Sequence, residues 1–512
     1  MVDRVSLLSG LAVPRILECA ASASPQRIAA TLGESELTYK QCSTSAAKIA
    51  HALSDWGVKR GDRILYWSDI SLDAISLYFA LSYLGAVFVP ANPAFSEAEI
   101  DAVAKYLRPA FIICDSAHQE PAQQLARDHA IGLAVLNGQG RTVAGYDLGG
   151  AVLQASDKPP RMVAAGCDPN IFYLTSGSTG TPKAVIISHQ AQYLRAGGSQ
   201  AYDAVCGGRG AVCMFPLFHM AGWYMILQAF GRRRTVHLTK KASAAELWSI
   251  VETHQPHELY CIPAVWHRML DEAQGRNGSC INFALTGTSR VELDLLEAIR
   301  GRFPNARNGI YYGSTEMGVS LGISHDDIPL HPYSVGIPMP NVETRVVDGE
   351  LWLRADTAMD GYFGLPDQTA EVMEGGWYRS GDLVSRNSDG FFEIVGRRRE
   401  IIRSGGETIS PAEVEAAISE MPGVQEAAVV GLPHEAWGEI VCAVIVAKFG
   451  HDSLSVDTVR AFLDGRLAAF KHPRIVRVWH DMLPRTSATG QIQRSRILTE
   501  LIAETEASAS HA

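Results

Sequence analysis

The chain has 512 residues and a mass of 55.4 kDa, which is too long for one ordinary hydrophobic core and predicts about three lobes. Hydrophobic residues make up 47% of the sequence and charged residues 20%, which excludes a disordered or fibrous chain. Because the formal net charge is −10, no overall positive field attracts nucleic acid or anionic membranes, and we expect neither as a partner.

The nine cysteines are spread singly from Cys19 to Cys442 without a CxxC pair. This spacing predicts neither a disulfide framework nor a zinc site, and it favours a cytoplasmic location. Asp3 and Pro14 interrupt the apolar start of the chain, so we do not expect an export signal.

From residue 28 onward, apolar strand-like segments alternate with amphipathic helices. The longest uncharged run, residues 74–95, contains polar residues and two prolines. It predicts a buried helix from Asp73 to Leu84, stopped by Gly85 and followed by a strand, rather than a membrane span. The first round of strand-like segments covers 63–68, 86–90, 111–115 and 133–137, with a further helix from Ser96.

A second round of strand-like segments runs from residues 172–176 to residues 308–315. Alternation of strands and helices is typical of βαβ units, in which helices cover both faces of a parallel sheet. The sequence therefore predicts two related α/β lobes.

A strand-rich region follows. Residues 343–355 are predicted to form a hairpin around Asp348-Gly349, and residues 391–396 a strand after the turn at 388–390. These features predict a small β-barrel-like third lobe.

The pattern changes at the charged run Arg397 to Glu400, after which an α+β pattern begins. It comprises a helix at 411–421, strands at 425–433 and 441–449, a helix from Asp457, a strand at 474–480 and a frayed tail at 504–512. We therefore predict an α/β fold with a large N-terminal domain, residues 1–396, and an α+β C-terminal domain, residues 397–512.

The strongest local motif is TSGSTGTPK, residues 175–183, directly after an apolar strand. Glycines let backbone N–H groups approach a phosphate closely, hydroxyls donate hydrogen bonds and the lysine adds a positive charge. It is not a Walker loop, because Ala184 follows the lysine where Ser or Thr would hold Mg²⁺. The predicted phosphate-binding residues are Thr175, Ser176, Gly177, Ser178, Thr179, Gly180 and Lys183.

Two further polar turns end strands. Tyr312, Gly313, Thr315 and Glu316 offer an aromatic face, a close backbone approach, a hydroxyl and a possible Mg²⁺ ligand. The turn at 380–382 places Asp382 where a carboxylate can accept hydrogen bonds from both ribose hydroxyls. Each turn alone is more typical of an ordinary loop than of a binding site.

Taken in order, these motifs resemble the adenylate-forming superfamily of acyl-CoA synthetases, luciferases and peptide-synthetase adenylation domains. The remaining matching segments are PLFH at 216–219, GRRRE at 396–400, SGGETISPAEVE at 404–415 and PRTSATGQIQR at 484–494. The resemblance implies an enzyme that joins a carboxylate to AMP from Mg²⁺-ATP and then transfers the acyl group to the thiol of CoA. Between the two steps the C-terminal domain rotates.

The resemblance also implies roles for individual residues. Thr315 reaches the α-phosphate, Glu316 the metal, and Asp382 with Arg397 the ribose. The other implied positions are Gly287 and Thr288 along adenine, Arg399 at the hinge, His219 at the acyl site, and Gly405 and Gly406 facing the CoA arm.

The acyl group is expected to be sizeable and apolar. No carboxylate stands near residues 218–220, so the ammonium of an amino acid would be buried without a partner. Large side chains surround the predicted acyl site, namely Trp223, Tyr224, Met225, Cys261, Tyr311 and Met317.

One position departs from the family pattern. The last motif of the family ends in a lysine that enters the site during adenylation, whereas this chain has Gln491 there and one extra residue, Ala488. The same departure resembles non-adenylating ligases of platensimycin and platencin biosynthesis, which implies a diterpenoid substrate. We therefore expect adenylation to be lost or crippled, with the acyl-adenylate supplied by a separate adenylating ligase.

Alternatives remain at this stage. In the first, the chain is a complete two-step ligase that uses ATP and Mg²⁺, and in the second Gln491 is an engineered substitution. In the third, the protein binds acyl-adenylate without turnover, and in the fourth a carrier protein replaces CoA as the acceptor. The presence of Gly405, Gly406, Asp382 and Arg397 favours retained turnover.

Overall fold

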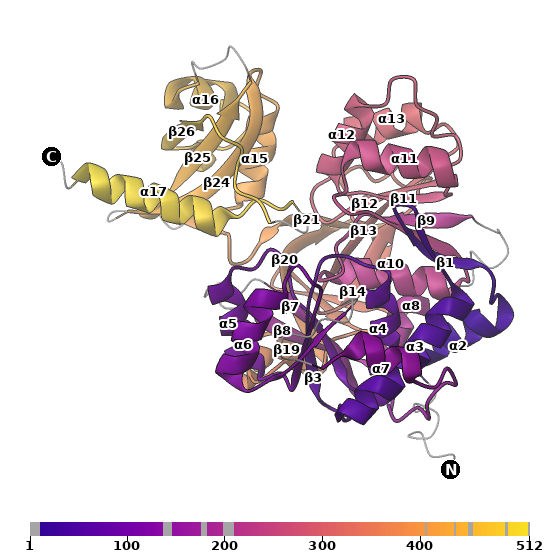
Figure 1. The fold of residues 1–512 in the computed structure, drawn as a ribbon. Helices are drawn as coiled ribbons and strands as arrows, with labels where there is room; N and C mark the ends of the chain where they lie inside the picture. The colour runs from indigo at the N-terminus through magenta and orange to yellow at the C-terminus, as the bar shows by residue number, and fades with distance from the viewer. Residues whose placement is uncertain are drawn as a thin grey trace. The chain divides into compact units, whose positions relative to one another are not determined.

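The computed structural model describes residues 11–136, 146–175, 182–197, 209–404, 407–434, 437–448, 454–486 and 490–509 (Figure 1). The chain has a mixed α/β architecture with a large N-terminal and a smaller C-terminal part, which confirms the predicted fold class. Two compact units can be distinguished, the first comprising Met1–Pro332, Pro338–Glu343 and Arg354–Tyr378, the second Tyr333–Ile337, Thr344–Leu353 and Arg379–Ala512. The domain boundary after residue 396 and the hinge stay predictions.

The first unit contains a seven-stranded sheet. Its order is β18-β8-β7-β4-β3-β5-β6, and the strands from β7 to β6 along this order are parallel. The strands are β3 (Arg63–Trp67), β4 (Val87–Pro90), β5 (Phe111–Cys114), β6 (Gly132–Val135), β7 (Pro169–Thr175), β8 (Lys183–Ser188) and β18 (Gly361–Tyr362).

The helix predicted after β3 is confirmed as α4 (Asp73–Leu84). Every residue of α4 after Asp73 is buried, and Gly85 ends the helix in the left-handed conformation at φ 65°. Helix α5 (Glu97–Leu107) begins at Ser96 with a capping box to Glu99, as the sequence predicts. Within the described residues no helix is both long and apolar enough to cross a bilayer.

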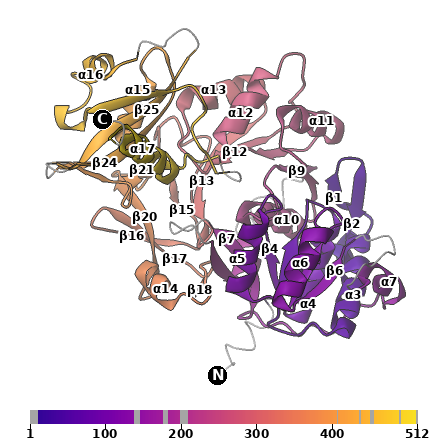
Figure 2. The same ribbon diagram turned by 60° about the vertical axis from the view of Figure 1, so that its left-hand side comes forward.

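A nine-stranded sheet completes the first unit, in the order β15-β14-β13-β12-β11-β9-β10-β1-β2. Helices α11 (Ala244–His254), α12 (Pro263–Asp271) and α13 (Leu293–Arg302) lie side by side against it (Figures 1 and 2). The strands are β1 (Ile28–Leu32), β2 (Ser35–Thr38), β9 (Gly210–Cys213), β10 (Thr235–Leu238), β11 (Glu258–Tyr260), β12 (Phe283–Gly287), β13 (Arg307–Ser314), β14 (Gly318–Ile323) and β15 (Ile337–Pro338).

The predicted division of the two lobes in chain order is wrong. Strand β7, which was expected to open the second lobe, pairs with β4 of the seven-stranded sheet, whereas β1 pairs with β10 of the nine-stranded sheet. The sheets are also not purely parallel, since β2, β8, β14 and β18 are antiparallel to their neighbours. Hydrophobic periodicity identifies strands but not their distant partners, which accounts for both errors.

The remaining helices of the first unit connect or cover these strands. They are α2 (Pro14–Ala23), α3 (Tyr39–Trp56), α6 (Gln119–His129), α7 (Leu148–Gln154), α8 (His189–Gly197), α10 (Met220–Gly231) and α14 (Pro366–Val372).

The strand-rich region forms a five-stranded sheet in the order β16-β17-β20-β19, with β21 beside β20 (Figure 2). The predicted hairpin is confirmed, because β16 and β17 are neighbours joined by Asp348 at φ 50° and Gly349 at φ 78°. The strands are β16 (Glu343–Val347), β17 (Glu350–Arg354), β19 (Met373–Glu374), β20 (Trp377–Arg386) and β21 (Phe392–Arg397).

The C-terminal residues form a sheet in the order β23-β22-β25-β24, with β26 paired to β25. Alternate residues of β24 face two separate hydrophobic cores, Val429 in one and Val430 in the other. The tail expected to be frayed is helical as far as Ala509. The elements are β22 (Ile402–Ser404), β23 (Glu407–Ile409), α15 (Pro411–Ser419), β24 (Val424–His434), β25 (Gly438–Ala447), α16 (Val456–Leu463), β26 (Ile475–Trp479) and α17 (Arg494–Ala509).

Candidate functional site

The ends of the predicted phosphate loop are neighbours in the structure. Strands β7 and β8 form an antiparallel hairpin in which Thr175 and Lys183 are cross-strand partners. The Oγ1 hydroxyl of Thr175 donates a hydrogen bond to the Lys183 carbonyl over 3.4 Å. The loop between them, with Ser176, Gly177, Ser178, Thr179 and Gly180, lies outside the described residues.

A tyrosine connects this hairpin to the candidate metal ligand. Strand β18 pairs with β8, placing Tyr362 opposite Val185. The Lys183 ammonium nitrogen lies 4.9 Å from the centroid of the Tyr362 ring, and the Tyr362 hydroxyl donates to Glu316 Oε1 over 3.0 Å. A cation and a carboxylate from motifs 133 residues apart thus contact the same tyrosine, the cation at its ring and the carboxylate at its hydroxyl.

The turn that carries Glu316 joins β13 to β14. Gly313 is required by packing, because a Cβ there would lie 2.2 Å from the Gly318 carbonyl oxygen. Tyr312 near the end of β13 and Thr315 on the turn are both half-buried. Burial raises the pKa of the neighbouring Tyr378 well above its usual value, and the nearby Glu316 adds to this effect, so Tyr378 stays a neutral phenol.

Arg195 of α8 forms a hydrogen bond with the backbone of this turn. Its side chain is buried, with 4% of the residue exposed, and its Nη2 donates to the Glu316 carbonyl over 3.1 Å and to the Thr357 carbonyl over 2.7 Å. Burial lowers the pKa of Arg195 to about 10, which still leaves the guanidinium charged at neutral pH. The cation therefore fixes the backbone of the turn.

Sequence reasoning missed both Tyr362 and Arg195. No local motif marks either residue, since Tyr362 reaches the site through the pairing of β18 with β8 and Arg195 through the packing of α8. The pairing of a two-residue strand is decided by contacts far along the chain.

The predicted adenine-binding position ends β12, beside the start of the same turn. Gly287 pairs with Tyr311 on β13, and a Cβ at Gly287 would lie 2.2 Å from the Tyr311 carbonyl oxygen and 2.9 Å from the Tyr260 hydroxyl. Thr288 follows with φ 71°, an uncommon value for threonine. Ligands of α/β sheets bind at the carboxyl ends of parallel strands, where both residues lie.

His219 caps the N-terminus of α10. Its Nδ1 accepts a hydrogen bond from the Ala221 backbone N–H over 3.2 Å, and its ring stacks on Phe215 with centroids 6.0 Å apart. Burial lowers the pKa of His219 to about 4, so the imidazole is neutral at pH 7 and carries its proton on Nε2.

Aromatic rings continue from His219 towards β13. Phe215 contacts Tyr260 with ring centroids 5.2 Å apart, and Tyr260 contacts Tyr311 at 6.3 Å. Tyr224 of α10 lies near this group, and its pKa is raised by burial and, to a lesser degree, by Tyr311. The predicted acyl-site residues His219, Tyr224 and Tyr311 thus belong to one cluster.

Other predicted acyl-site residues belong to the core. Trp223 is fully buried, donates its indole N–H to the Leu217 carbonyl over 2.7 Å and packs on the ring of Tyr78. Cys261 and Met317 are also fully buried. The structure places Trp223 on a different packing surface from the His219 cluster.

The predicted ribose ligands are paired in the second unit. Asp382 and Arg397 are partners on β20 and β21, and Arg397 Nε lies 2.9 Å from Asp382 Oδ1. Asp382 is 4% exposed, whereas Arg397 and Arg399 are exposed. Gly405 and Gly406 lie outside the described residues.

Gln491 belongs to a closed turn. The Thr486 N–H donates to the Gln491 carbonyl over 2.8 Å, and the Gln491 N–H donates to the Thr486 hydroxyl over 3.1 Å. Arg485 donates to the Gly490 carbonyl over 2.7 Å. The extra residue Ala488 lies outside the described residues.

Lysines are rare in the C-terminal part of the sequence. After residue 400 the sequence contains only Lys448 and Lys471. The Lys471 ammonium forms an ion pair with Glu413 over 2.5 Å.

Each unit contains groups whose chemistry suits part of a nucleotide. In the first unit, Lys183 has a positive charge suited to phosphates and Glu316 a hard oxygen suited to Mg²⁺; in the second, Asp382 has a carboxylate suited to hydroxyl donors. Among the described residues, no group of three or more His, Cys, Asp or Glu side chains is arranged to hold a metal ion.

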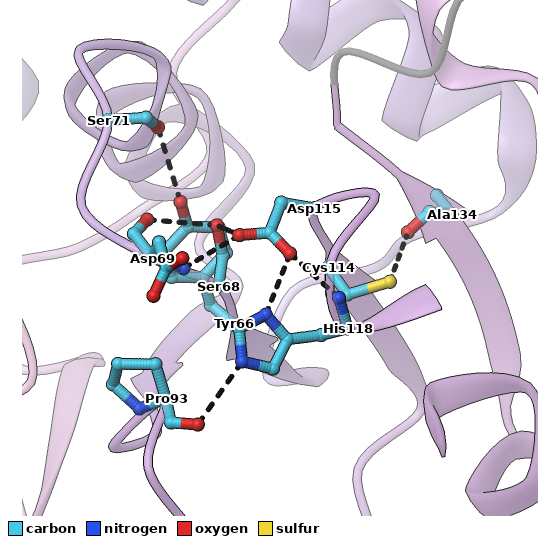
Figure 3. A network of polar contacts seen from close by, with 9 residues as sticks. All are labelled: Tyr66, Ser68, Asp69, Ser71, Pro93, Cys114, Asp115, His118 and Ala134. Carbon is cyan, nitrogen blue, oxygen red and sulfur yellow. Dashed lines mark hydrogen bonds and ion pairs between the residues drawn. The ribbon is translucent and has the colours of Figure 1, made fainter. Parts of the chain in front are cut away.

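A separate polar network follows β3 and β5 in the first unit (Figure 3). The Asp115 carboxylate accepts hydrogen bonds from the Ser68 hydroxyl, the Asp69 N–H and the ring Nδ1 of His118, over 2.7 to 3.1 Å. The other ring nitrogen of His118 lies 3.1 Å from the Pro93 carbonyl oxygen. Both ends of this network are occupied by protein groups, so it joins three loops rather than forming an open site.

Comparisons with known proteins agree with this chemistry. The profile of the family described as AMP-binding enzyme matches residues 17–363, and that of the AMP-binding enzyme C-terminal domain matches residues 413–489. A feruloyl-CoA synthase of Amycolatopsis sp. is 29% identical over 93% of this chain and 96% of its own. An indoleacetate–CoA ligase of Aromatoleum aromaticum is 28% identical over 93% of this chain and 96% of its own.

Solved structures share the fold. ATP-bound MatB of Rhodopseudomonas palustris superimposes with a TM-score of 0.86, covering 95% of this chain and 98% of its own at 23% identity. The o-succinylbenzoate CoA synthetase of Bacillus subtilis, in complex with its acyl-adenylate intermediate, has a TM-score of 0.83 with 94% and 98% coverage, also at 23% identity.

Proposed function

The chain belongs to the AMP-binding enzyme family, and on that premise we propose that it is an acyl-CoA ligase that converts an acyl-adenylate and CoA into acyl-CoA and AMP. Relatives named as CoA ligases or synthases that match over nine-tenths of the chain support the reaction class. The substitution at Gln491 is the observation that carries the restriction to the second half reaction.

The first unit supplies the groups for phosphate and adenine. We assign the β- and γ-phosphates of ATP to residues 175–183, the α-phosphate to Thr315 and the adenine to Gly287 and Thr288. Glu316 would hold Mg²⁺, which, when bound, neutralises charge on the phosphate oxygens. The Tyr362 hydroxyl holds the carboxylate of Glu316, and the ring of the same tyrosine contacts the Lys183 ammonium.

The acyl group is assigned to the cluster of His219, Tyr224 and Tyr311. A neutral imidazole with its proton on Nε2 can donate a hydrogen bond to an acyl or phosphate oxygen without requiring a counter-ion. The aromatic rings favour a sizeable apolar acid, such as an aryl or diterpenoid acid.

Adenylation requires a cation that this chain lacks at the expected position. Attack of a carboxylate on a triphosphate brings two anions together, and a preorganised donor at the reacting oxygen is worth about 10²–10³ in rate, or about 3–4 kcal/mol. An amide donates a hydrogen bond but carries no charge. Lys471 pairs with Glu413 and belongs to a different segment of the family pattern, residues 470–474.

The second half reaction does not need that cation. The CoA sulfur attacks the acyl carbonyl carbon, a C–S bond forms, the C–O bond to phosphate breaks, and AMP leaves with the electron pair while the thiol proton passes to solvent. The anhydride is already activated, so catalysis here is mainly positioning. The acyl-adenylate would come from a separate adenylating ligase.

The test supplies either ATP, Mg²⁺ and a free acid, or the preformed acyl-adenylate, each with CoA. We expect thioester from the adenylate and little pyrophosphate from ATP, with at least a 100-fold difference, of the order expected for loss of one such donor. Gln491→Lys should raise pyrophosphate release, while Gln493→Lys, two residues away, serves as the control for an added charge. Equal turnover from both substrate sets would contradict the restriction and leave a complete ligase.

A complete two-step ligase is the second candidate, favoured by the presence of Lys183 and Glu316, which serve adenylation. Two further candidates are distinguished by the acceptor. A protein that binds acyl-adenylate without turnover would consume no thiol, and an acyltransferase to a carrier protein would prefer a phosphopantetheinyl protein over CoA.

A further inference from the structure

Ion pairs anchor Arg397, Arg398 and Glu400 of the charged run within the second unit. Arg397 pairs with Asp382, Arg398 with Glu350 and Glu400 with Arg494, each over 2.9 Å. Glu350, the partner of Arg398, begins β17, whereas Arg494, the partner of Glu400, begins α17, so the two sides of Arg399 have different attachments.

Glu350 is the anchor on the first side. It is the first residue of β17, and the side chain is buried, with 4% of the residue exposed. Its Oε1 accepts the Gly381 N–H over 2.9 Å, and its Oε2 accepts the Arg398 guanidinium over 2.9 Å. A buried carboxylate is stable only with such partners, so both contacts are energetically coupled to it.

These two contacts hold the predicted ribose ligands in place. Gly381 directly precedes Asp382, and the Arg398 N–H donates to the Gly381 carbonyl over 2.8 Å. The Ser380 hydroxyl donates to the Leu351 carbonyl over 2.6 Å, which attaches the same turn to β17 a second time. The positions of Asp382 and Arg397 therefore depend on Glu350 and on the contacts of the turn with β17.

Arg494 is the anchor on the second side. Its guanidinium donates to Glu400 and makes two bonds to Glu415 of α15, over 2.9 and 2.6 Å. Glu415 also accepts the Val429 N–H over 2.7 Å. Glu400 is thereby attached to the C-terminal sheet through α15 and β24.

We propose that Glu350 is a positioning residue for Asp382 and Arg397, and that the Glu350–Arg398 and Glu400–Arg494 pairs confine the rotation of the C-terminal domain to Arg399. The rotation is the one that the family resemblance implies, and it rests on the proposed function. Two hydrogen bonds span Arg399, because the Ser410 hydroxyl donates to the Val395 carbonyl over 2.6 Å and the Glu400 N–H donates to the Arg397 carbonyl over 3.0 Å. We expect rotation about Arg399 to break these bonds while both ion pairs remain intact.

The experiment uses the full chain with Glu350→Gln, Arg398→Lys and Glu400→Gln, and Glu420→Gln as the matched control. Glutamine at 350 keeps an acceptor for Gly381 but loses the charge opposite Arg398, whereas lysine at 398 keeps the ion pair. Glu420 pairs with Arg466 on the surface, away from the run, over 3.2 Å. The readouts are the AMP dissociation constant by calorimetry and the rate of trypsin cleavage after Arg397, Arg398 and Arg399, mapped by mass spectrometry.

Glu350→Gln should weaken AMP binding and speed cleavage by about ten-fold each, as expected for one charge-assisted hydrogen bond. Glu400→Gln should speed cleavage while changing AMP affinity less than about two-fold, and Arg398→Lys and the control should resemble the parent in both readouts. Unchanged AMP affinity and cleavage in a folded Glu350→Gln protein would overturn the proposal.

If Glu350→Gln does not fold, Arg398→Gln tests the same pair from the exposed side, with the same expected and contradicting results. The cleavage pattern requires no turnover. A parent chain that forms no thioester would therefore defeat the proposed function without deciding the anchors.

Discussion

Tyr362 presents its ring to the Lys183 ammonium, 4.9 Å from the centroid, while its hydroxyl is bonded to Glu316. One side chain thus contacts both a cation and a carboxylate that are far apart in the sequence. The two contacts can be removed separately, because phenylalanine keeps the ring and leucine keeps neither.

Tyr362→Phe should weaken Mg²⁺-ATP binding by about three-fold and Tyr362→Leu by about ten-fold or more, since the first loses one hydrogen bond and the second also loses a cation–π contact. Calorimetric titration of the nucleotide measures both. Tyr146→Phe, which loses a bond to the Ala52 carbonyl elsewhere in the first unit, is the control. Equal affinities in Tyr362→Phe and Tyr362→Leu would show that the ring is unimportant.

Arg195→Met should destabilise the protein by about 3 kcal/mol, because it leaves the Glu316 and Thr357 carbonyls without their charged donor. Urea unfolding at pH 7 measures the free energy of unfolding. Arg268→Lys, at a side chain with one bond to its own helix, should change it by less than about 0.5 kcal/mol. A loss below 1 kcal/mol in Arg195→Met would contradict a supporting role for this cation.

His219 makes the stability depend on pH on the acid side. Burial lowers the pKa of His219 to about 4, below its unfolded value of about 6.5, so the unfolded state binds the extra proton first. The free energy of unfolding should therefore fall as pH drops from 6.5 to 4, with a contribution of up to about 3 kcal/mol from this group. His219→Gln should flatten that part of the profile, whereas an unchanged slope would argue against a buried neutral imidazole.

Asp115 should make the free energy of unfolding depend on pH in a lower pH range than His219 does. Burial alone would raise its pKa, but hydrogen bonds from His118 and the Asp69 N–H outweigh burial and hold the pKa below its ordinary value. Its stabilisation is present above the unfolded pKa of about 3.9 and is lost as pH falls through the folded pKa. Asp115→Asn should cost about 1–2 kcal/mol at pH 7 and lose less on acidification. Chemical unfolding at pH 7 and pH 3 measures this, with Asp128→Asn as the exposed control.

Features set by neighbouring residues could be predicted from the sequence. Gly85 ends α4, Ser96 begins α5 with a capping box, and Asp348-Gly349 forms the turn of the β16–β17 hairpin. Each depends on backbone preferences within a few residues. The spaced motifs likewise identified the family, because each carries its own chemistry.

Features set by distant pairing could not be predicted. The sheet that receives β1, the partner of β18 and the contact of Arg195 with the Glu316 turn all depend on segments more than 100 residues apart. A local pattern predicts whether an element is a helix or a strand but does not identify the element with which it pairs. Tyr362 and Arg195 therefore became visible only in three dimensions.

The two sheets of the first unit are built from strands that alternate between them along the chain. This arrangement affects folding during synthesis and the choice of sites at which the chain can be split. During synthesis β1 leaves the ribosome about 200 residues before its partner β10, and β8 well before its partner β18. Neither sheet can therefore be completed until much of the other has been synthesised. No cut between the lobes yields two complete halves. Fragment complementation or domain grafting should therefore treat residues up to about 363 as one indivisible piece.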